Sequence, residues 1–340
     1  MRFQSEMTQA AFGGFEEGAH YLTHRARPVG CSPEEPRNSG FEMKDLVRMK
    51  PAFSTVACPD WTLDTIAEHA GRWGFLGCEL RTFGYGSTHF SCDPALTAPA
   101  KARLMLERAG LEIMSLATGI RYDDPITPPV LGVMLDNESS VRESKSAIDL
   151  AVRLEAPYVR VFGFEIIGNE RRASALARIS SRLGKAVDHA RNSGVKVMLE
   201  NGGSFSTAAQ MAELMDMVNN PLLVAAYSAP VAAAAGEKPS DGVNVLGERL
   251  VCVKVRDFDN GTPCALGDGQ IDNRSVIEAL AKVGFPGWVV YEYDKAWLDP
   301  AKKAADLDEV LGVSARRLFE WINAARAGTG LRPDLQRVRT

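Results

Sequence analysis

The chain has 340 residues, with 39 Lys and Arg side chains against 43 Asp and Glu side chains, which gives a formal net charge of −4. Hydrophobic residues make up 45% of the sequence and charged residues 24%. This composition is typical of a folded globular protein, and it excludes a disordered chain, a collagen-like chain and a strongly basic nucleic-acid binder.

The two ends of the chain differ from its middle. Residues 1–48 mix Gly, Pro, Glu and Arg without sustained periodicity, so we predict an irregular N-terminal extension there and a C-terminal tail over residues 326–340. No stretch has the apolar run of a signal peptide or a membrane span, so we expect a cytoplasmic protein with no membrane or nucleic-acid partner. None of the six cysteines forms a C-x-x-C pair, which favours reduced, buried thiols.

Short apolar runs rich in β-forming residues alternate with longer amphipathic stretches through the middle of the chain. Eight such runs predict strands, at 52–57, 75–81, 112–117, 158–163, 195–201, 222–228, 250–257 and 288–293. An amphipathic stretch that predicts a helix follows each run except the sixth, where the pattern is weak. Many of these stretches end at Gly or Asn, the usual stop signal of a helix.

Eight successive strand–helix units predict parallel strands that are connected by helical crossovers. The count of eight favours a closed (β/α)8 TIM barrel that forms a single domain over residues 49–325. The alternative is an open, doubly wound sheet, whose usual mark is a G-x-G-x-x-G turn after the first strand. The sequence has CPDWT at that place instead.

Polar residues stand at the ends of several predicted strands, where a barrel collects its chemistry. Because side chains alternate between the lumen and the helix layer, Glu79 and Arg81 share one face of the second strand, and Lys254 and Arg256 share one face of the seventh. An unpaired buried charge costs several kcal/mol, so we expect the strand-end charges to converge and pair in one cavity. The charges expected to converge are Glu79, Glu200, Lys254, Arg256 and Glu292, while Arg81, Arg160, Asn201 and Ser228 also stand at strand ends.

Over roughly residues 49–325 the sequence resembles the sugar phosphate isomerase/epimerase family of xylose isomerase-like barrels. The resemblance rests on GFLGCELR at the second strand, VKVMLENGG at the fifth and VCVKVRD at the seventh. Its most specific part is LGDGQID followed by GFPGWVVYEY, which runs from Gly267 to Glu292. The family includes ketose 3-epimerases, hydroxypyruvate isomerase-like proteins and inosose dehydratase-like proteins.

The resemblance implies a divalent metal held by Glu, Asp, His and Glu at the ends of the fifth to eighth strands. Glu200 and Glu292 match the first and last of these ligands, but Ser228 and Lys254 stand at the other two positions. A serine hydroxyl is a poor ligand, and a protonated lysine repels a cation. We therefore expect no cofactor, with the Lys254 ammonium between the two glutamates. The alternative is a Mn, Mg or Zn ion held through Glu200 and Glu292.

In the metal-using relatives, two carboxylates flank the substrate and move a proton beside a carbonyl group. We predict that Glu200 and Glu292 keep these roles, while Lys254 and Arg256 stabilise the developing oxyanion. The predicted function is that of a sugar or keto-polyol isomerase or epimerase with a degenerate metal site. The predicted substrate contacts are Glu79, Arg81, His89, Arg160, Asn201, Ser228 and Arg256.

The sequence is also compatible with two other functions. The missing metal ligands favour a barrel that binds a sugar without catalysis. Lys254 could instead be the Schiff-base nucleophile of a lyase or aldolase, which requires a lowered lysine pKa; Arg256 would lower that pKa, and the glutamates would raise it. Members of the family often form dimers or tetramers, so a homo-oligomer is a further expectation.

Overall fold

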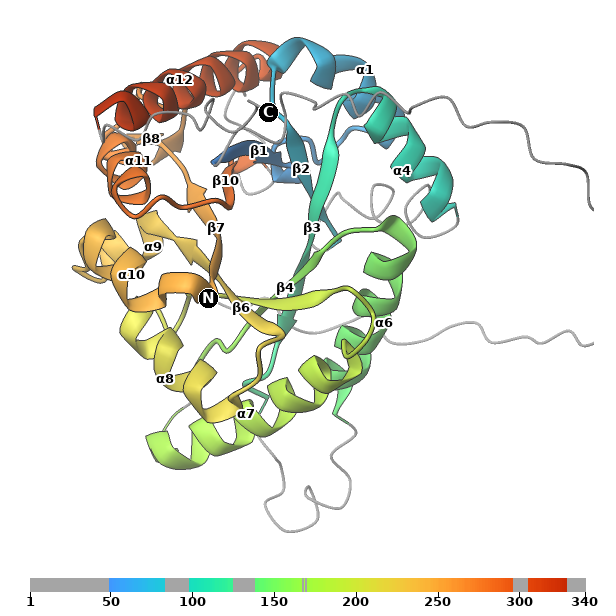
Figure 1. Ribbon diagram of the computed structural model, residues 1–340, viewed down its shortest axis with the longest axis vertical. Helices are drawn as coiled ribbons and strands as arrows, with labels where there is room; N and C mark the ends of the chain where they lie inside the picture. Colours follow the sequence, from blue (N-terminus) through green and yellow to red (C-terminus); the bar gives the residue numbers. More distant parts are fainter. Residues whose placement is uncertain are drawn as a thin grey trace, which may run out of the picture. The chain divides into compact units, whose positions relative to one another are not determined.

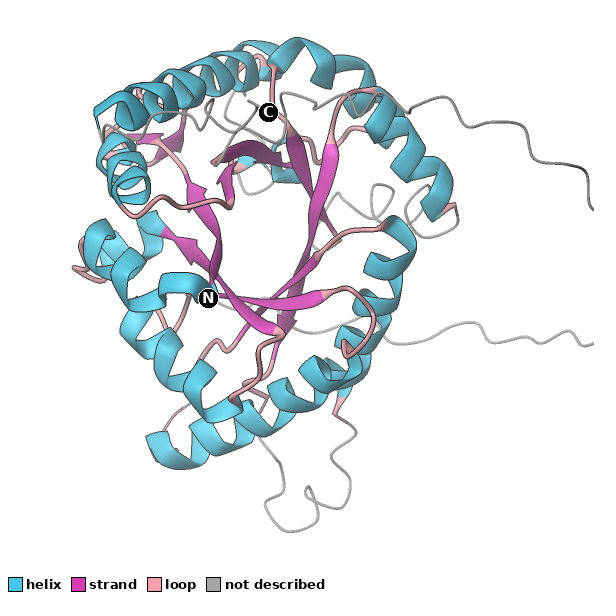
Figure 2. Ribbon diagram, in the orientation of Figure 1, coloured by secondary structure: helices cyan, strands magenta, loops and turns pink. Residues whose placement is uncertain are grey.

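The computed structural model describes residues 49–82, 98–124, 138–166, 168, 170–295 and 305–328. In this part of the chain, eight parallel strands form a closed barrel in the order β1-β10-β7-β6-β5-β4-β3-β2. Helices pack around the outside of the ring of strands (Figure 1, Figure 2). The predicted (β/α)8 barrel is therefore confirmed. The predicted extension over residues 1–48 lies outside the described residues.

The barrel strands begin and end close to their predicted positions. They are β1 (Lys50–Ser54), β2 (Gly77–Arg81), β3 (Glu112–Arg121), β4 (Tyr158–Phe162), β5 (Lys196–Glu200), β6 (Leu223–Ser228), β7 (Leu250–Val255) and β10 (Trp288–Tyr291). The first strand is shorter than predicted because Thr55–Ala57 form a 3-10 turn, and the third runs four residues beyond its predicted end.

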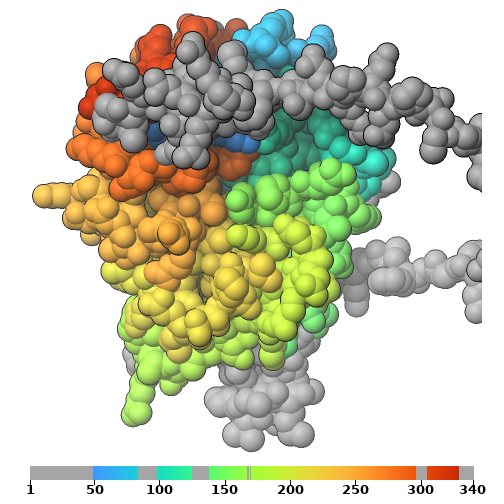
Figure 3. All heavy atoms as spheres, in the orientation of Figure 1, coloured from blue at the N-terminus to red at the C-terminus, as the bar shows by residue number. Residues whose placement is uncertain are grey.

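The helices follow the strands in the expected alternation, and Figure 3 shows the segments succeeding one another around the barrel in chain order. Two short helices occupy the region after the sixth strand, where the sequence pattern is weak. The described helices are α1 (Leu63–Trp73), α4 (Pro99–Arg108), α6 (Ser139–Leu154), α7 (Arg172–His189), α8 (Ala208–Val218), α9 (Ala229–Ala234), α10 (Pro239–Leu246), α11 (Asn273–Lys282) and α12 (Leu307–Gly328).

Local signals explain where these helices begin and end. The Thr62 hydroxyl accepts a hydrogen bond from the Thr65 amide at 3.3 Å, which caps the first turn of α1. Gly74 ends the same helix with φ 92°, a left-handed conformation that glycine adopts without steric cost. The residue that ends α8 is Asn219, which has a left-handed φ of 47°.

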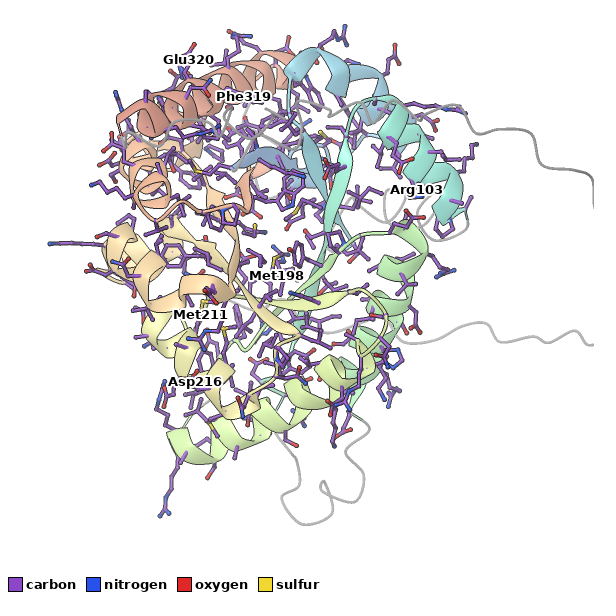
Figure 4. All side chains as sticks on the ribbon, in the orientation of Figure 1. Arg103, Met198, Met211, Asp216, Phe319 and Glu320 are labelled. Atoms are coloured by element: carbon purple, nitrogen blue, oxygen red, sulfur yellow. The ribbon has the colours of Figure 1, made fainter. Side chains whose placement is uncertain are left out.

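An apolar floor fills the lumen of the barrel below the strand ends. It consists of Ala52, Met114, Met198, Val224, Ala226, Cys252, Trp288 and Val290. Figure 4 shows Met198 inside the ring of strands. Side chains two positions apart point to the same face of a strand. In the lumen, Met198 on β5 is therefore followed by Glu200, and Cys252 on β7 is followed by Lys254. The floor therefore excludes water from one side of the layer that contains Glu200 and Lys254.

The state of the cysteines and the absence of a membrane-spanning helix can both be examined in the described residues. Cys58, Cys78 and Cys252 are buried free thiols, as predicted, Cys264 is a free thiol that is only half-buried, and Cys31 and Cys92 lie outside the described residues. No helix in the described ranges has the combination of length and apolar character that crossing a membrane requires.

The loop after β7 is organised around one buried carboxylate. Asp257 accepts backbone hydrogen bonds from Phe258 at 3.0 Å, Gly267 at 2.7 Å, Gly269 at 3.2 Å and Ile271 at 3.1 Å. A Cβ atom at position 269 would lie 2.2 Å from the Asp257 carboxylate, so only glycine fits there. The LGDGQID motif therefore wraps around Asp257 and holds the end of β7 in place.

Replacing Asp257 by Asn should destabilise the fold strongly. An amide side chain keeps one acceptor oxygen but turns an NH2 group toward backbone donors, which leaves buried N–H groups unsatisfied. We expect the free energy of unfolding to fall by about 3 kcal/mol. The matched control is Asp259→Asn, two residues away and exposed, which should change stability by less than about 0.5 kcal/mol. Equal effects of the two changes in urea unfolding would contradict this role of Asp257.

Candidate active site

The ammonium group of Lys254 lies at the centre of a ring of carboxylates in the barrel lumen. Its Nζ is 2.8 Å from Glu79 Oε1, 2.9 Å from Glu200 Oε2 and 2.7 Å from Glu292 Oε1. These side chains come from β2, from β5 and from the residue after β10, and all are buried. The predicted convergence of strand-end charges is confirmed by these contacts.

Two arginines complete the cluster. Arg160 Nη1 lies 3.2 Å from Glu200 Oε2 and 3.7 Å from Glu292 Oε1. Arg256 Nε donates to Glu292 Oε2 at 2.7 Å, and its Nη2 also contacts that oxygen. The cluster therefore contains three cations and three carboxylates, Arg160, Lys254, Arg256, Glu79, Glu200 and Glu292. The close pairing of opposite charges is what makes burial of so many ionised groups tolerable.

The three carboxylates differ in how fully their oxygens are used. Glu79 Oε1 accepts from Ser54 at 3.1 Å as well as from Lys254, and its Oε2 accepts from Ser115 at 3.0 Å. Glu292 is held through one oxygen by Lys254 and through the other by Arg256. In Glu200, by contrast, only Oε2 is engaged, since no described residue donates a hydrogen bond to its Oε1.

These contacts shift the pKa values of the central groups in opposite directions. Burial and the Arg160 guanidinium oppose the charge of Lys254, but the three carboxylates outweigh them and raise the pKa of Lys254 above its ordinary value. Burial alone would raise the pKa of Glu292, but Arg256 and Lys254 hold that pKa well below its usual range. Lys254 is therefore a permanent cation and Glu292 a permanent anion at neutral pH.

Two of the predicted substrate contacts make structural hydrogen bonds. Asn201 accepts from the Ser228 amide at 2.6 Å, and its amide group donates to the carbonyl oxygens of Ser228 and Ser206 at 3.1 and 2.9 Å. These bonds tie the end of β5 to the end of β6. The Ser228 side chain is buried, and its Oγ has no hydrogen-bond partner among the described residues. A substrate contact by either residue stays a prediction.

Three further predicted substrate contacts are Glu79, Arg81 and His89. Glu79 is fully buried beneath the Lys254 ammonium with both oxygens occupied, so in this structure it supports the cluster. Arg81 ends β2, where its backbone amide donates to Thr55 Oγ1 at 2.8 Å, and its side chain makes no ion pair with the cluster. His89 lies outside the described residues.

The sequence reasoning missed one titratable residue of the site. Asp294 Oδ2 lies 3.3 Å from Arg256 Nη1, and burial raises the pKa of Asp294 to about 6. The signal that could have found it is its position two residues after Glu292, and both carboxylates contact Arg256. Ser54 and Ser115 were also missed, and hydroxyls inside apolar strands carry no comparable signal.

The sequence matches the family model of the xylose isomerase-like TIM barrel over residues 67–312. The chain therefore belongs to this family. No curated protein matches the sequence significantly.

Several solved structures share the fold. An L-ribulose 3-epimerase matches with a TM-score of 0.69 at 15% identity, over 86% of this chain and 100% of that one. The IOLI protein with a bound zinc atom matches with a TM-score of 0.67 at 15% identity, over 82% and 99%. A D-psicose 3-epimerase from Clostridium cellulolyticum H10, solved with D-tagatose, matches with a TM-score of 0.64 at 14% identity, over 82% and 99%.

Replacing Lys254 by Met should destabilise the protein, and the loss should grow as the pH rises. Without the ammonium, the buried carboxylates repel one another and their pKa values rise above those of the unfolded chain. Stability is then retained at low pH, where they are protonated, and lost as the pH rises through the raised pKa values. At neutral pH we expect a loss of about 3–5 kcal/mol, measured by chemical unfolding between pH 5 and pH 8.

The matched control is Lys196→Met, an exposed lysine at the start of β5, which should show no such pH dependence. Adding Glu79→Gln to Lys254→Met removes one carboxylate and should recover part of the lost stability. A Lys254→Met protein as stable as the wild type throughout this pH range would show that the cluster does not depend on the ammonium.

Proposed function

We propose that this protein is an isomerase or epimerase that acts on a small carbohydrate-like substrate, with Lys254 in place of a catalytic metal ion. One observation carries the proposal. The Lys254 ammonium is held in the lumen among three carboxylates, and one of them, Glu200, keeps an oxygen that no described residue occupies. A fixed positive charge beside an available carboxylate oxygen is what proton transfer next to a carbonyl group requires.

The donor set does not fit a divalent metal ion. A metal between Glu200 and Glu292 would compete with the Lys254 ammonium, which already contacts both side chains. A protonated amine cannot act as a ligand, and its charge repels a cation. Among the described residues, no group of three or more His, Cys, Asp or Glu side chains is arranged to hold a metal. In the proposal, the site works without one.

The contacts suggest separate roles for the two glutamates. Glu200 removes a proton from the carbon beside the substrate carbonyl and returns it to the neighbouring carbon; inversion of the first carbon would take its proton from water on the opposite face. Lys254 and Arg160, which both contact Glu200, stabilise the oxyanion that forms when the C–H electrons move onto the carbonyl. Glu292 is a weak base because its pKa is lowered, so it keeps the cations in place. This differs from the predicted pair of proton-transferring carboxylates.

The structural relatives support a carbohydrate-like substrate. Two of the matching barrels are a ribulose 3-epimerase and a psicose 3-epimerase, whose substrates are ketoses. A ketose offers a carbonyl next to a carbon-bound proton, which is the group that Glu200 and Lys254 would act on. The identities of 14–15% make this an argument about reaction class rather than about one particular sugar.

A barrel that binds a sugar without catalysis is the second candidate. The observation that favours it is the complete internal pairing of Glu79 and Glu292, which leaves few charged groups free to react. The Schiff-base mechanism is not supported, because it needs a neutral amine and the carboxylates raise the pKa of Lys254.

Glu200→Gln should slow proton transfer strongly while the fold is kept. In D₂O the wild-type protein should introduce deuterium next to the carbonyl of a ketose substrate, as read by NMR over a panel of ketopentoses and ketohexoses. The variant should exchange about 10²–10⁴ times more slowly. Glu213→Gln, an exposed glutamate of a surface ion pair, is the control and should exchange normally. Ketose binding without deuterium incorporation by the wild type would establish the binding-only alternative.

Metal removal should leave the protein unchanged. Dialysis against EDTA should not alter the melting temperature or the exchange rate, because the positive charge of the site belongs to the chain. Adding Mn²⁺, Mg²⁺ or Zn²⁺ should likewise give no saturable thermal shift. A saturable increase in melting temperature that is lost in Glu200→Gln would instead place a metal at this site.

A further inference from the structure

Arg81 is a buried cation outside the Lys254 cluster. Its side chain is 1% exposed, and none of its three guanidinium nitrogens has a hydrogen-bond partner among the described residues. Such a group is unusual, because five N–H donors and a full charge are removed from water without direct compensation. The cost is visible in the pKa of Arg81, which burial lowers from its ordinary value.

The side chain of Arg81 belongs to the mouth of the barrel. Glu79 contacts Lys254 in the lumen, and Arg81 lies two residues further along β2, on the same face. Two residues of a strand rise by about 6.6 Å, so Arg81 stands one layer above the ammonium, toward the C-terminal end of the barrel. A small molecule that reaches Glu200 from this end would pass through the same layer.

Among the described residues, the charges around Arg81 leave one positive charge uncompensated. Asp60 and the Cys58 thiol act on the guanidinium electrostatically. Asp60 is paired with Lys295, whose Nζ lies 3.7 Å from its Oδ2. Burial raises the pKa of Cys58 to about 12, so the thiol is neutral. The opposite charges of Asp60 and Lys295 cancel each other, so this pair does not neutralise the positive charge of Arg81.

We propose that Arg81 binds the carboxylate of the substrate, and that the substrate class is therefore a small sugar acid or hydroxy-keto acid. This inference rests on the proposed function in taking the barrel mouth as the binding site. The planar guanidinium presents parallel N–H donors that match the two oxygens of a carboxylate. A carboxylate carries a single charge, which equals the one uncompensated charge at this place. A phosphate carries close to two at neutral pH and would exceed it.

The test measures binding by the full-length protein to three probes of similar size. These are D-fructose, which is neutral, D-gluconate, which carries a carboxylate, and D-fructose 6-phosphate. Isothermal titration gives the dissociation constants, and thermal unfolding gives the stability with and without each probe. The variants are Arg81→Met and Arg81→Lys, and the control is Arg172→Met, an exposed arginine of α7 that pairs with Glu213.

We expect the wild type and Arg172→Met to bind gluconate at least tenfold more tightly than fructose. Arg81→Met should lose about 10- to 100-fold in gluconate affinity, as for lost hydrogen bonds to a charged group, with fructose affinity unchanged. Arg81→Lys should keep part of the preference. Without ligand, Arg81→Met should melt at or above the wild-type temperature, because it removes an uncompensated buried charge. If Arg81 only stabilised the fold, Arg81→Met would melt below the wild-type temperature.

Three results would overturn the inference. The first is equal binding of gluconate and fructose by the wild type. The second is a gluconate affinity that does not change in Arg81→Met. The third is tighter Arg81-dependent binding of the phosphate ester, which would contradict the assignment to a carboxylate. If gluconate binding depends on Arg81 but no deuterium exchange occurs, the carboxylate inference stands and the proposed function is wrong. If neutral ketoses exchange deuterium and Arg81 has no effect on binding or exchange, the proposed function stands and the carboxylate inference is wrong.

Discussion

The contact between the Lys254 ammonium and three buried carboxylates is the interaction on which the candidate active site depends. An amine and carboxylates at 2.7–2.9 Å stabilise one another only because each would be costly to bury alone. The contact also sets the protonation states, since it keeps the amine charged and Glu292 ionised. In the proposed function, this positive charge belongs to the chain itself and takes the place of a metal ion.

The barrel makes this cluster by layering along its strands. Apolar side chains such as Met198 and Cys252 fill the lumen one layer below, and they remove water from beneath the charges. The Asp257 carboxylate gathers the loop after β7 and so fixes the strand end that presents Lys254. The floor and the loop together give the ion pairs a low-dielectric, rigid surrounding, in which their electrostatic effect on a substrate is strongest.

Two kinds of buried cation occur at this end of the barrel, and they are held very differently. Lys254 is surrounded by carboxylates, so its charge is used internally to organise the site. Arg81 has no such partner among the described residues, so its charge is available to a molecule that enters from outside. Under the proposed function, the cluster around Lys254 carries out the chemistry, and Arg81 on β2 recognises the ligand.

The sequence by itself determined the barrel and the identity of most charged residues in the site. Eight apolar runs, the helix stops such as Gly74 and the alternation of side chains are local properties, so they can be read from neighbouring residues. Only the tertiary structure decided how the charges pair, because Glu79 and Lys254 are 175 positions apart and meet through closure of the barrel. From the sequence alone, Glu200 and Glu292 have the same predicted role. The positions of Arg256 and Arg160 distinguish them, because the three-dimensional arrangement of donors decides which carboxylate oxygens stay unoccupied.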